Sequence, residues 1–183
     1  SSFRIARQLL ERLEDSADGR IVPEAFNAEI PGHRREQAQA AANVISTQLR
    51  DRFPFTGETE AEQADLTELV LNRSWRPALE VTGADGLPPI ADAGNVLRAR
   101  TALKLALRLP PTIPGDDATQ RLQQLLEANP PHNARVTFTP DQAASGWHAP
   151  TLSPWLADAM DAASREAFGE PVMYMGEGGT IPF

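Results

Sequence analysis

The spacing of apolar residues switches along this chain between the helical period of three to four residues and the strand period of two. The first stretch is helical: Ser2 is a candidate N-cap, Gly19 marks the end, and the apolar stripe consists of Ile5, Ala6, Leu9, Leu10 and Leu13. The next region, residues 20 to 74, carries weaker signals. It could contain a short strand at Ile21 and Val22 and helices over Ala38 to Leu49 and Glu62 to Leu71. We interpret it as an insertion rather than a separate domain.

Two segments that follow Trp75 have the period of strands. Leu79 and Val81 alternate with polar residues before a turn-forming run over 83 to 89. The second segment places leucines at 103, 105, 107 and 109 on one face, with Lys104, Ala106 and Arg108 on the other. This pattern predicts a strand with one buried and one polar face, which the prolines from 110 onward end.

The remaining elements complete a recognisable order. Asp116 or Asp117 is expected to cap a helix over residues 118 to 126, and a short strand is expected over 135 to 139. Ser153 and Pro154 begin a further helix that Phe168 and Gly169 close, and a short strand over 172 to 174 leads into a glycine turn. The order helix, insertion, strand, strand, helix, strand lacks only a leading strand to be a split βαβ sandwich.

Composition narrows the class of protein without identifying it. The 183 residues carry a net charge of −8, with 41% hydrophobic residues and no cysteine. This balance favours a soluble protein with a packed core and argues against nucleic acid or an anionic membrane as partner. Without cysteine there is no disulfide framework and no thiolate nucleophile or ligand. No apolar run has the length of a signal peptide or membrane span, and we expect a cytoplasmic protein.

No self-contained catalytic or metal motif is visible in the sequence. The three histidines, His33, His132 and His148, do not stand at helical metal-site spacing, so each is expected to be a surface or loop residue. No nucleophile elbow or phosphate-binding Walker loop occurs. The residues by themselves therefore predict no catalytic or metal centre.

Two motifs can bind an anion, and each has a simpler structural explanation. Arg108 could pair with a nearby carboxylate on the surface of its strand, or its planar guanidinium could hold a ligand carboxylate in bidentate fashion. The run Gly176-Glu-Gly-Gly-Thr180 could be a tight turn, or it could offer backbone N–H groups and a hydroxyl to an anion. Asn95, which follows Gly94, could simply stabilise a turn.

A series of ordered motifs resembles the dinuclear zinc exopeptidases of the carnosinase and aminoacylase type. The motifs span the chain and include Trp75-Arg-Pro, Ala93-Gly-Asn-Val-Leu-Arg98, Leu107-Arg-Leu-Pro-Pro111, Gly146-Trp and Gly176-Glu-Gly-Gly-Thr-Ile-Pro-Phe183. In this family, a ferredoxin-like lid is inserted into a catalytic zinc domain, and two lids join in a dimer. The resemblance therefore implies an α+β, ferredoxin-like two-layer sandwich with its helices on one face of an antiparallel sheet, a helical insertion and a short catalytic-domain segment. It assigns residues 1 to 149 to the lid, whose first strand would precede Ser1, and 150 to 183 to the catalytic domain.

The resemblance also implies roles for individual residues. Asn95 is similar to a lid residue that stabilises the oxyanion in the partner subunit's site, and Arg108 to the arginine that binds the substrate's C-terminal carboxylate. Gly178, Gly179 and Thr180 resemble the turn that helps to hold the same carboxylate. The two zinc ions of the family, and the ligands that bind them, would belong to the parent enzyme outside this chain.

We therefore expect the lid and substrate-binding portion of a zinc metallopeptidase, either a dipeptidase or a related amidohydrolase, that acts as a homodimer on a small peptide or an N-acyl amino acid. This chain alone is expected to bind no zinc and to be inactive. The alternative is a free-standing ferredoxin-like module for dimerisation or small-ligand binding, without catalysis.

Overall fold

The chain forms two compact units in a computed structural model that describes residues 1–61 and 63–179. The first unit consists of Ser1–Ala28 and Arg76–Gly146, and the second of Glu29–Trp75 and Trp147–Phe183. Most of the region expected as an insertion thus groups with the C-terminal segment. Which ranges correspond to a lid and to a catalytic domain stays a prediction.

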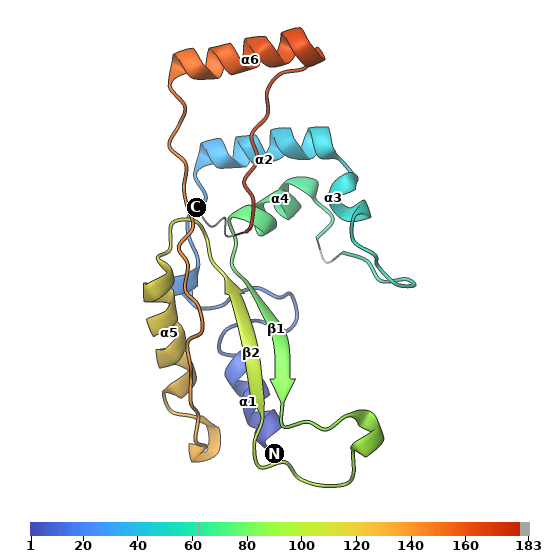
Figure 1. The fold of residues 1–183 in the computed structure, drawn as a ribbon, viewed down its shortest axis with the longest axis vertical. Helices are drawn as coiled ribbons and strands as arrows, with labels where there is room; N and C mark the ends of the chain where they lie inside the picture. Colours follow the sequence, from blue (N-terminus) through green and yellow to red (C-terminus); the bar gives the residue numbers. More distant parts are fainter. Residues whose placement is uncertain (62, 180–183) are drawn as a thin grey trace. The chain divides into compact units, whose positions relative to one another are not determined.

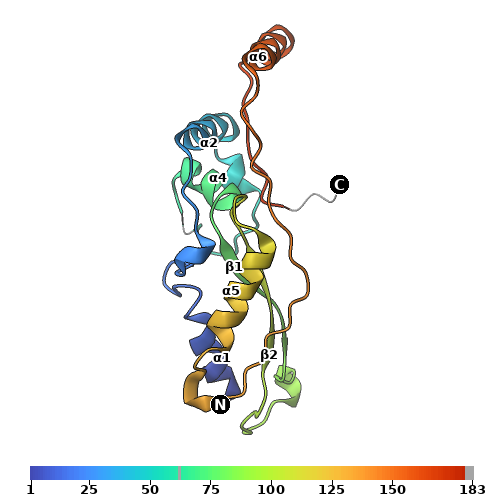
Figure 2. The same cartoon turned by 90° about the vertical axis from the view of Figure 1, so that its left-hand side faces the viewer.

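The first unit is built on a β-hairpin and two helices (Figures 1 and 2). Strands β1 (Ala78–Asp85) and β2 (Ala102–Arg108) pair in antiparallel fashion, and their register runs from Ala78 opposite Arg108 to Asp85 opposite Ala102. Helix α1 (Ser2–Leu10) precedes the hairpin in the chain, and α5 (Gly115–Glu127) follows it. The three short 3-10 turns of this unit are Glu24–Phe26, Ile90–Asp92 and Pro131–Asn133.

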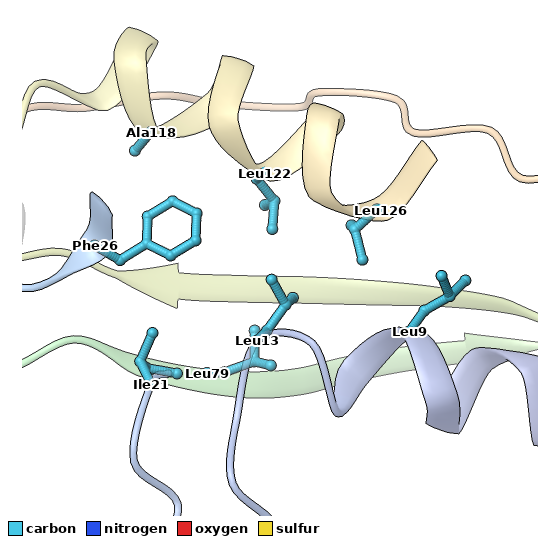
Figure 3. Packing of buried hydrophobic residues seen from close by; sticks show 8 residues of the cluster. All are labelled: Leu9, Leu13, Ile21, Phe26, Leu79, Ala118, Leu122 and Leu126. Carbon is cyan, nitrogen blue, oxygen red and sulfur yellow. The ribbon is translucent and has the colours of Figure 1, made fainter. Parts of the chain in front are cut away.

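One face of the hairpin carries the core of the first unit. Leu105 and Leu107 pack against the core, whereas the side chains that alternate with them in β2 are exposed. Figure 3 shows side chains from α5 pointing toward those from α1, from the segment that follows it and from β1: Leu9, Leu13, Ile21, Phe26, Leu79, Ala118, Leu122 and Leu126. Because both helices contribute to this one cluster, they cover the same face, and the predicted α+β fold is confirmed. Each large side chain buried here contributes about 1.5 to 3 kcal/mol to folding.

A bulge changes the predicted alternation in β1. Val81 pairs with Leu105, but the next ladder pair is Gly83 with Lys104, so Thr82 is an extra residue on its strand. An extra residue shifts the following side chains relative to the partner strand. Val81 precedes the extra residue and still pairs with Leu105, so the bulge does not account for its exposure. Leu79 is 8% exposed and Val81 is 47% exposed, and the expectation that the two share one buried face is wrong.

The ends of the predicted helices differ from the structure in two places. Helix α1 begins at Ser2 and ends at Leu10, well before Gly19, and Ser1 is its N-cap residue. The Ser2 hydroxyl instead donates to the carbonyl oxygen of Arg98 and hydrogen-bonds the Thr101 hydroxyl, at 2.9 and 2.8 Å. A cap residue can satisfy only the donors of its own helix, whereas this tertiary contact joins α1 to the hairpin loop.

The expected capping aspartates of α5 are in its first turn rather than at the cap. The N-cap residue is Pro114, which has no side-chain acceptor, and Asp116 and Asp117 follow Gly115. Acidic side chains in a first turn still interact favourably with the helix dipole. The backbone N–H of Gly115 donates to the Ser145 hydroxyl at 3.0 Å, so a distant residue supplies the cap that the sequence did not indicate.

The strand expected over 135 to 139 is not formed within the described residues. The burial of this segment alternates as in a strand, and Val136 and Phe138 pack against the core of the first unit. Its backbone has no ladder partner, and the N–H of Phe138 donates to a carboxylate oxygen of Glu127 at 2.7 Å. Alternation alone cannot form a strand, because a ladder requires a neighbouring strand whose position is set by the fold.

The second unit is helical. It contains α2 (Gly32–Ile45), α3 (Gln48–Asp51), α4 (Leu66–Ser74) and α6 (Pro154–Phe168). Helices α2 and α4 pack together around a second apolar cluster: Ile30, Ala38, Ala42, Leu49, Val70, Leu71 and Trp75. The prediction for α6 is confirmed, since Ser153 precedes it and Gly169 ends it with φ 77°, a left-handed conformation that suits glycine.

The strand expected over 172 to 174 is also absent from the described residues. The backbone N–H of Val172 donates to the Asp161 carboxylate at 3.2 Å instead of to a neighbouring strand. The side chain of Asp161 is already held by Arg165, whose Nε donates to it at 2.7 Å. The segment that leads to the glycine turn is thus attached to α6 by side-chain contacts.

Candidate substrate-carboxylate site

Arg108 is the last residue of β2, on the strand's exposed face. Leu107 and Leu109, its neighbours in the chain, pack toward the core and so fix the direction in which Arg108 points. None of the described residues forms a hydrogen bond or ion pair with its guanidinium. The explanation in which Arg108 pairs with a nearby carboxylate of its own surface therefore finds no support within the described part of the chain.

A second cation on the same face does have such a partner. The Lys104 ammonium lies 2.7 Å from a carboxylate oxygen of Asp141. This hydrogen bond, together with the attraction between the two charges, raises the pKa of Lys104 and lowers the pKa of Asp141. The face thus carries one cation that is neutralised internally and another, Arg108, whose donors remain available to a ligand.

Asn95 lies in the long loop that joins the two strands. The base of this loop is fixed by an ion pair between Asp85 and Arg100 at 3.4 Å. Gly86 at its start has φ 88° and lies so close to the carbonyl oxygen of Arg100 that a side chain there would collide with it. The side-chain amide of Asn95 is exposed and forms no hydrogen bond with any described residue. It is therefore presented to the surroundings rather than used to stabilise its own turn.

The residues around Asn95 are unusually apolar for an exposed loop. Ile90 is 95% exposed and Leu97 is 86% exposed, and the large apolar residues exposed in this loop are Leu87, Ile90, Val96 and Leu97. Exposed apolar side chains that gather in one place are typical of surfaces that become covered by a partner.

The structure does not bring Asn95 and Arg108 of one chain together. The loop that carries Asn95 leaves the hairpin at the Asp85 and Ala102 pair, whereas Arg108 pairs with Ala78 at the other end. Six residue steps along β2, at the usual rise per residue, correspond to about 20 Å. A single amino acid or dipeptide cannot contact two groups that far apart.

The glycine turn belongs to the second unit, and Thr180 lies outside the described residues. Gly178 is partly exposed and Gly179 is exposed. The residues just before them are held by the end of α4: Glu177 forms an ion pair with Arg73 at 2.7 Å. Sequence analysis did not identify Arg73, because no local pattern relates two residues that are 104 positions apart.

Within the described residues, the histidines form no metal site with acidic residues. His33 and His148 stack with their ring centroids 6.2 Å apart, and the rings of His148 and Trp75 form a T-shaped pair with centroids 5.1 Å apart. The Nε of Arg34 donates to Nε2 of His148 at 3.3 Å. Across the described ranges, no three or more His, Cys, Asp or Glu side chains gather closely enough to hold a metal ion. These residues do not fit a dinuclear zinc site, and no metal-dependent step can be built from them.

Among the helices that the structure describes, none has both the length and the apolar character needed to cross a membrane.

Comparison with known proteins gives matches among solved structures only. No family model and no curated protein matches the chain. An M20 family metallo-carboxypeptidase, Sso-CP2 from Sulfolobus solfataricus, is similar with a TM-score of 0.66 at 18% identity over 98% of this chain and 45% of that one. The dipeptidase Dug1p from Saccharomyces cerevisiae has a TM-score of 0.59 at 19% identity, and human carnosine dipeptidase 1 has a TM-score of 0.62 at 20% identity.

Each of the two dipeptidases matches 98% of this chain over 38% of its own length, so the chain spans less than half of the structures it resembles. The resemblance seen in the sequence motifs is thereby confirmed at the level of the fold. The chain has the fold of a part of M20-type metallopeptidases.

Proposed function

We propose that this chain is the lid and substrate-carboxylate-binding portion of a zinc-dependent metallopeptidase, a dipeptidase or related amidohydrolase that hydrolyses peptide or N-acyl amide bonds. The observation that carries the proposal is the match of 98% of the chain to less than half of each of three metallopeptidases. The part of the parent enzyme outside this chain would hold the two zinc ions. The role of this chain is then to bind the substrate and to bring two subunits together.

Arg108 binds the substrate's C-terminal carboxylate in this proposal. Its position on the exposed face of β2 and the lack of a described internal partner both support the role. A guanidinium that is not already engaged can form two parallel hydrogen bonds with a carboxylate. The resemblance gives a second part to this role, because the turn that Gly178, Gly179 and Thr180 match in the sequence helps to hold the carboxylate in that family.

Asn95 acts in the site of the partner subunit. The separation of about 20 Å along β2 between its loop and Arg108 supports this division, because the two residues of one chain cannot serve one small substrate. The amide of Asn95 then donates to the oxyanion that develops during hydrolysis. The exposed apolar residues of its loop are covered on assembly.

The dimer forms through the lid. Within the described residues β1 and β2 pair only with each other, and an unpaired strand edge favours continuation of the sheet in a second copy. A parent enzyme that remains monomeric at high concentration in light scattering would count against this part of the proposal.

Subunit mixing tests the proposal in the full-length enzyme. An Asn95→Ala parent is mixed with a parent whose zinc ligands are substituted. In the heterodimer, one site combines intact metals with an intact Asn95 from the other subunit. Random exchange at equal concentrations makes half of the dimers mixed, and about a quarter of the wild-type activity returns.

An Arg108→Ala parent is the matched control, since Arg108 serves its own subunit's site. Mixing it with the zinc-ligand variant leaves the raised KM unchanged, because every site with intact metals lacks its arginine. If subunits demonstrably exchange and the Asn95→Ala mixture stays inactive, Asn95 does not act across the dimer. A longer reading frame with no histidine-aspartate segment upstream would favour the free-standing module instead.

A further inference from the structure

The glycine turn is held against the last turn of α4 by an ion pair. A guanidinium nitrogen of Arg73 donates to a carboxylate oxygen of Glu177 at 2.7 Å. The Arg73 side chain is 33% exposed and that of Glu177 is 55% exposed, so the pair lies at the surface without being fully solvated. Glu177 immediately precedes the two glycines whose N–H groups would face the substrate carboxylate.

Two further contacts fix the residues before the turn. Met175 packs against the apolar cluster that includes Leu71 and Trp75. A Cβ added at Gly176 would lie 3.0 Å from the Cβ of Ser74, so the chain approaches the end of α4 more closely than most side chains allow. The Ser74 hydroxyl donates to the carbonyl oxygen of Val70 at 2.7 Å and is held inside the helix. The approach of the turn to α4 therefore does not depend on the ion pair alone.

The charge of Glu177 is a problem for a site that binds anions. A carboxylate one residue away from Gly178 would repel a carboxylate bound at the backbone N–H groups of the turn. The ion pair with Arg73 cancels this charge and keeps the Glu177 carboxylate directed to α4. With the pair formed, the turn presents its N–H groups without a net negative charge beside them.

We propose that Arg73 is a positioning residue for substrate binding, which acts by neutralising Glu177 and orienting it away from the anion-binding N–H groups of Gly178 and Gly179. This inference rests on the proposed function, in which the turn holds the substrate's carboxylate. It assigns a role to a residue that does not itself touch the substrate.

The test measures kcat and KM of the full-length enzyme with a dipeptide and with the same dipeptide amidated at its C-terminus. Arg73→Met removes the charge and keeps the bulk of the side chain. We expect it to raise KM for the free acid by on the order of three- to tenfold, with little change in kcat, because a nearby unpaired charge is screened by solvent. KM for the amide stays within about twofold of wild type, since the amide carries no charge to repel.

A substitution at Glu177 shows whether Arg73 acts by neutralising the Glu177 carboxylate or only by supporting the local structure. Since the cause is the unpaired carboxylate, the double variant Arg73→Met with Glu177→Gln should return KM for the free acid to within about twofold of wild type. Arg73→Lys, which keeps the charge, should retain most of the affinity. Arg165→Met is the matched control, because it removes another ion pair, that of Arg165 with Asp161 at 2.7 Å, in the same unit. It should leave KM unchanged.

Three results would overturn the inference. The first is an unchanged KM for the free acid in a folded Arg73→Met enzyme, and the second is a rise of equal size for the free acid and the amide. The third is a double variant as impaired as Arg73→Met. If Arg108→Ala raises KM for the free acid more than KM for the amide in these cases, the proposed function survives and only the role of Arg73 fails. If neither arginine affects the discrimination between acid and amide, the proposed carboxylate site itself is wrong.

Discussion

Replacement of Arg108 in the full-length enzyme gives the most direct test of the carboxylate site. Arg108→Ala removes a guanidinium that has no partner among the described residues and lies on an exposed strand face. Within the described part of the chain, no internal ion pair is lost and no buried group is left unsatisfied. The free energy of unfolding should therefore change by no more than about 0.5 kcal/mol, as for ordinary surface substitutions.

The effect on binding is larger because a charged hydrogen-bond pair with the substrate is lost. Such pairs contribute about 1 to 3 kcal/mol, so KM for a substrate with a free C-terminal carboxylate should rise by about 5- to 150-fold. We expect kcat to change much less, since the interaction is formed equally in the bound substrate and the transition state. The KM of Arg108→Lys should lie between the values of the wild type and of Arg108→Ala, because an ammonium keeps the charge but cannot form the bidentate pair.

Steady-state kinetics with a matched amide substrate, together with thermal melting, distinguishes these effects. Lys104→Ala is the control on the same strand face. It removes a cation that is already paired with Asp141, and KM should be unaffected. An Arg108→Ala enzyme with intact folding and an unchanged KM for the free acid would refute the assignment of Arg108.

Three further predictions concern the 183-residue chain itself. Arg12→Met should lower the free energy of unfolding, measured by urea denaturation, by on the order of 2 kcal/mol, because the Arg12 guanidinium donates to three carbonyl oxygens at the end of α5 at 2.6 to 2.8 Å. Arg20→Met is the control, because it removes only a surface ion pair of 3.8 Å with Asp18, and equal losses in the two variants would contradict the prediction. Gly86→Ala should lower the melting temperature, since φ 88° costs about 1 kcal/mol or more for a residue with a side chain, and an unchanged melting curve would argue against the described turn. The pKa of Glu127 is lowered from its ordinary 4.5, mainly by the hydrogen bond from the Phe138 N–H. The ionised Glu127 carboxylate therefore stabilises the fold above about pH 4.5, and this stabilisation is lost as the pH falls through the lowered pKa. An NMR titration in which the amide signal of Phe138 does not follow the protonation of Glu127 would show that the two are not coupled.

The local pattern of the sequence was sufficient to predict the elements that need only their own residues and one apolar face. The hairpin strands, α5 and α6 were predicted from periodicity and from flanking prolines and glycines, and the structure confirms them. The two-residue period of β2 also predicted that Arg108 lies on the face opposite the leucines. These features follow from rules that act over a few residues.

Predictions that required a distant partner were wrong or could not be made. Residues 135 to 139 have the alternation of a strand, but the structure provides no neighbouring strand to pair with them within the described ranges. The same applies to residues 172 to 174. The bulge at Thr82 likewise depends on the register of both strands, which a single strand's pattern does not contain.

The candidate site was determined partly by the sequence and partly by the tertiary structure. The sequence supplied the chemical types, an arginine on a polar strand face and glycines in a turn, and the resemblance supplied their possible roles. Only the tertiary structure separated Asn95 from Arg108 by the length of β2 and brought Arg73 to Glu177. The physical reason is that periodicity fixes which face of an element a side chain occupies, whereas its partners depend on contacts between segments that the chain brings together only when it folds.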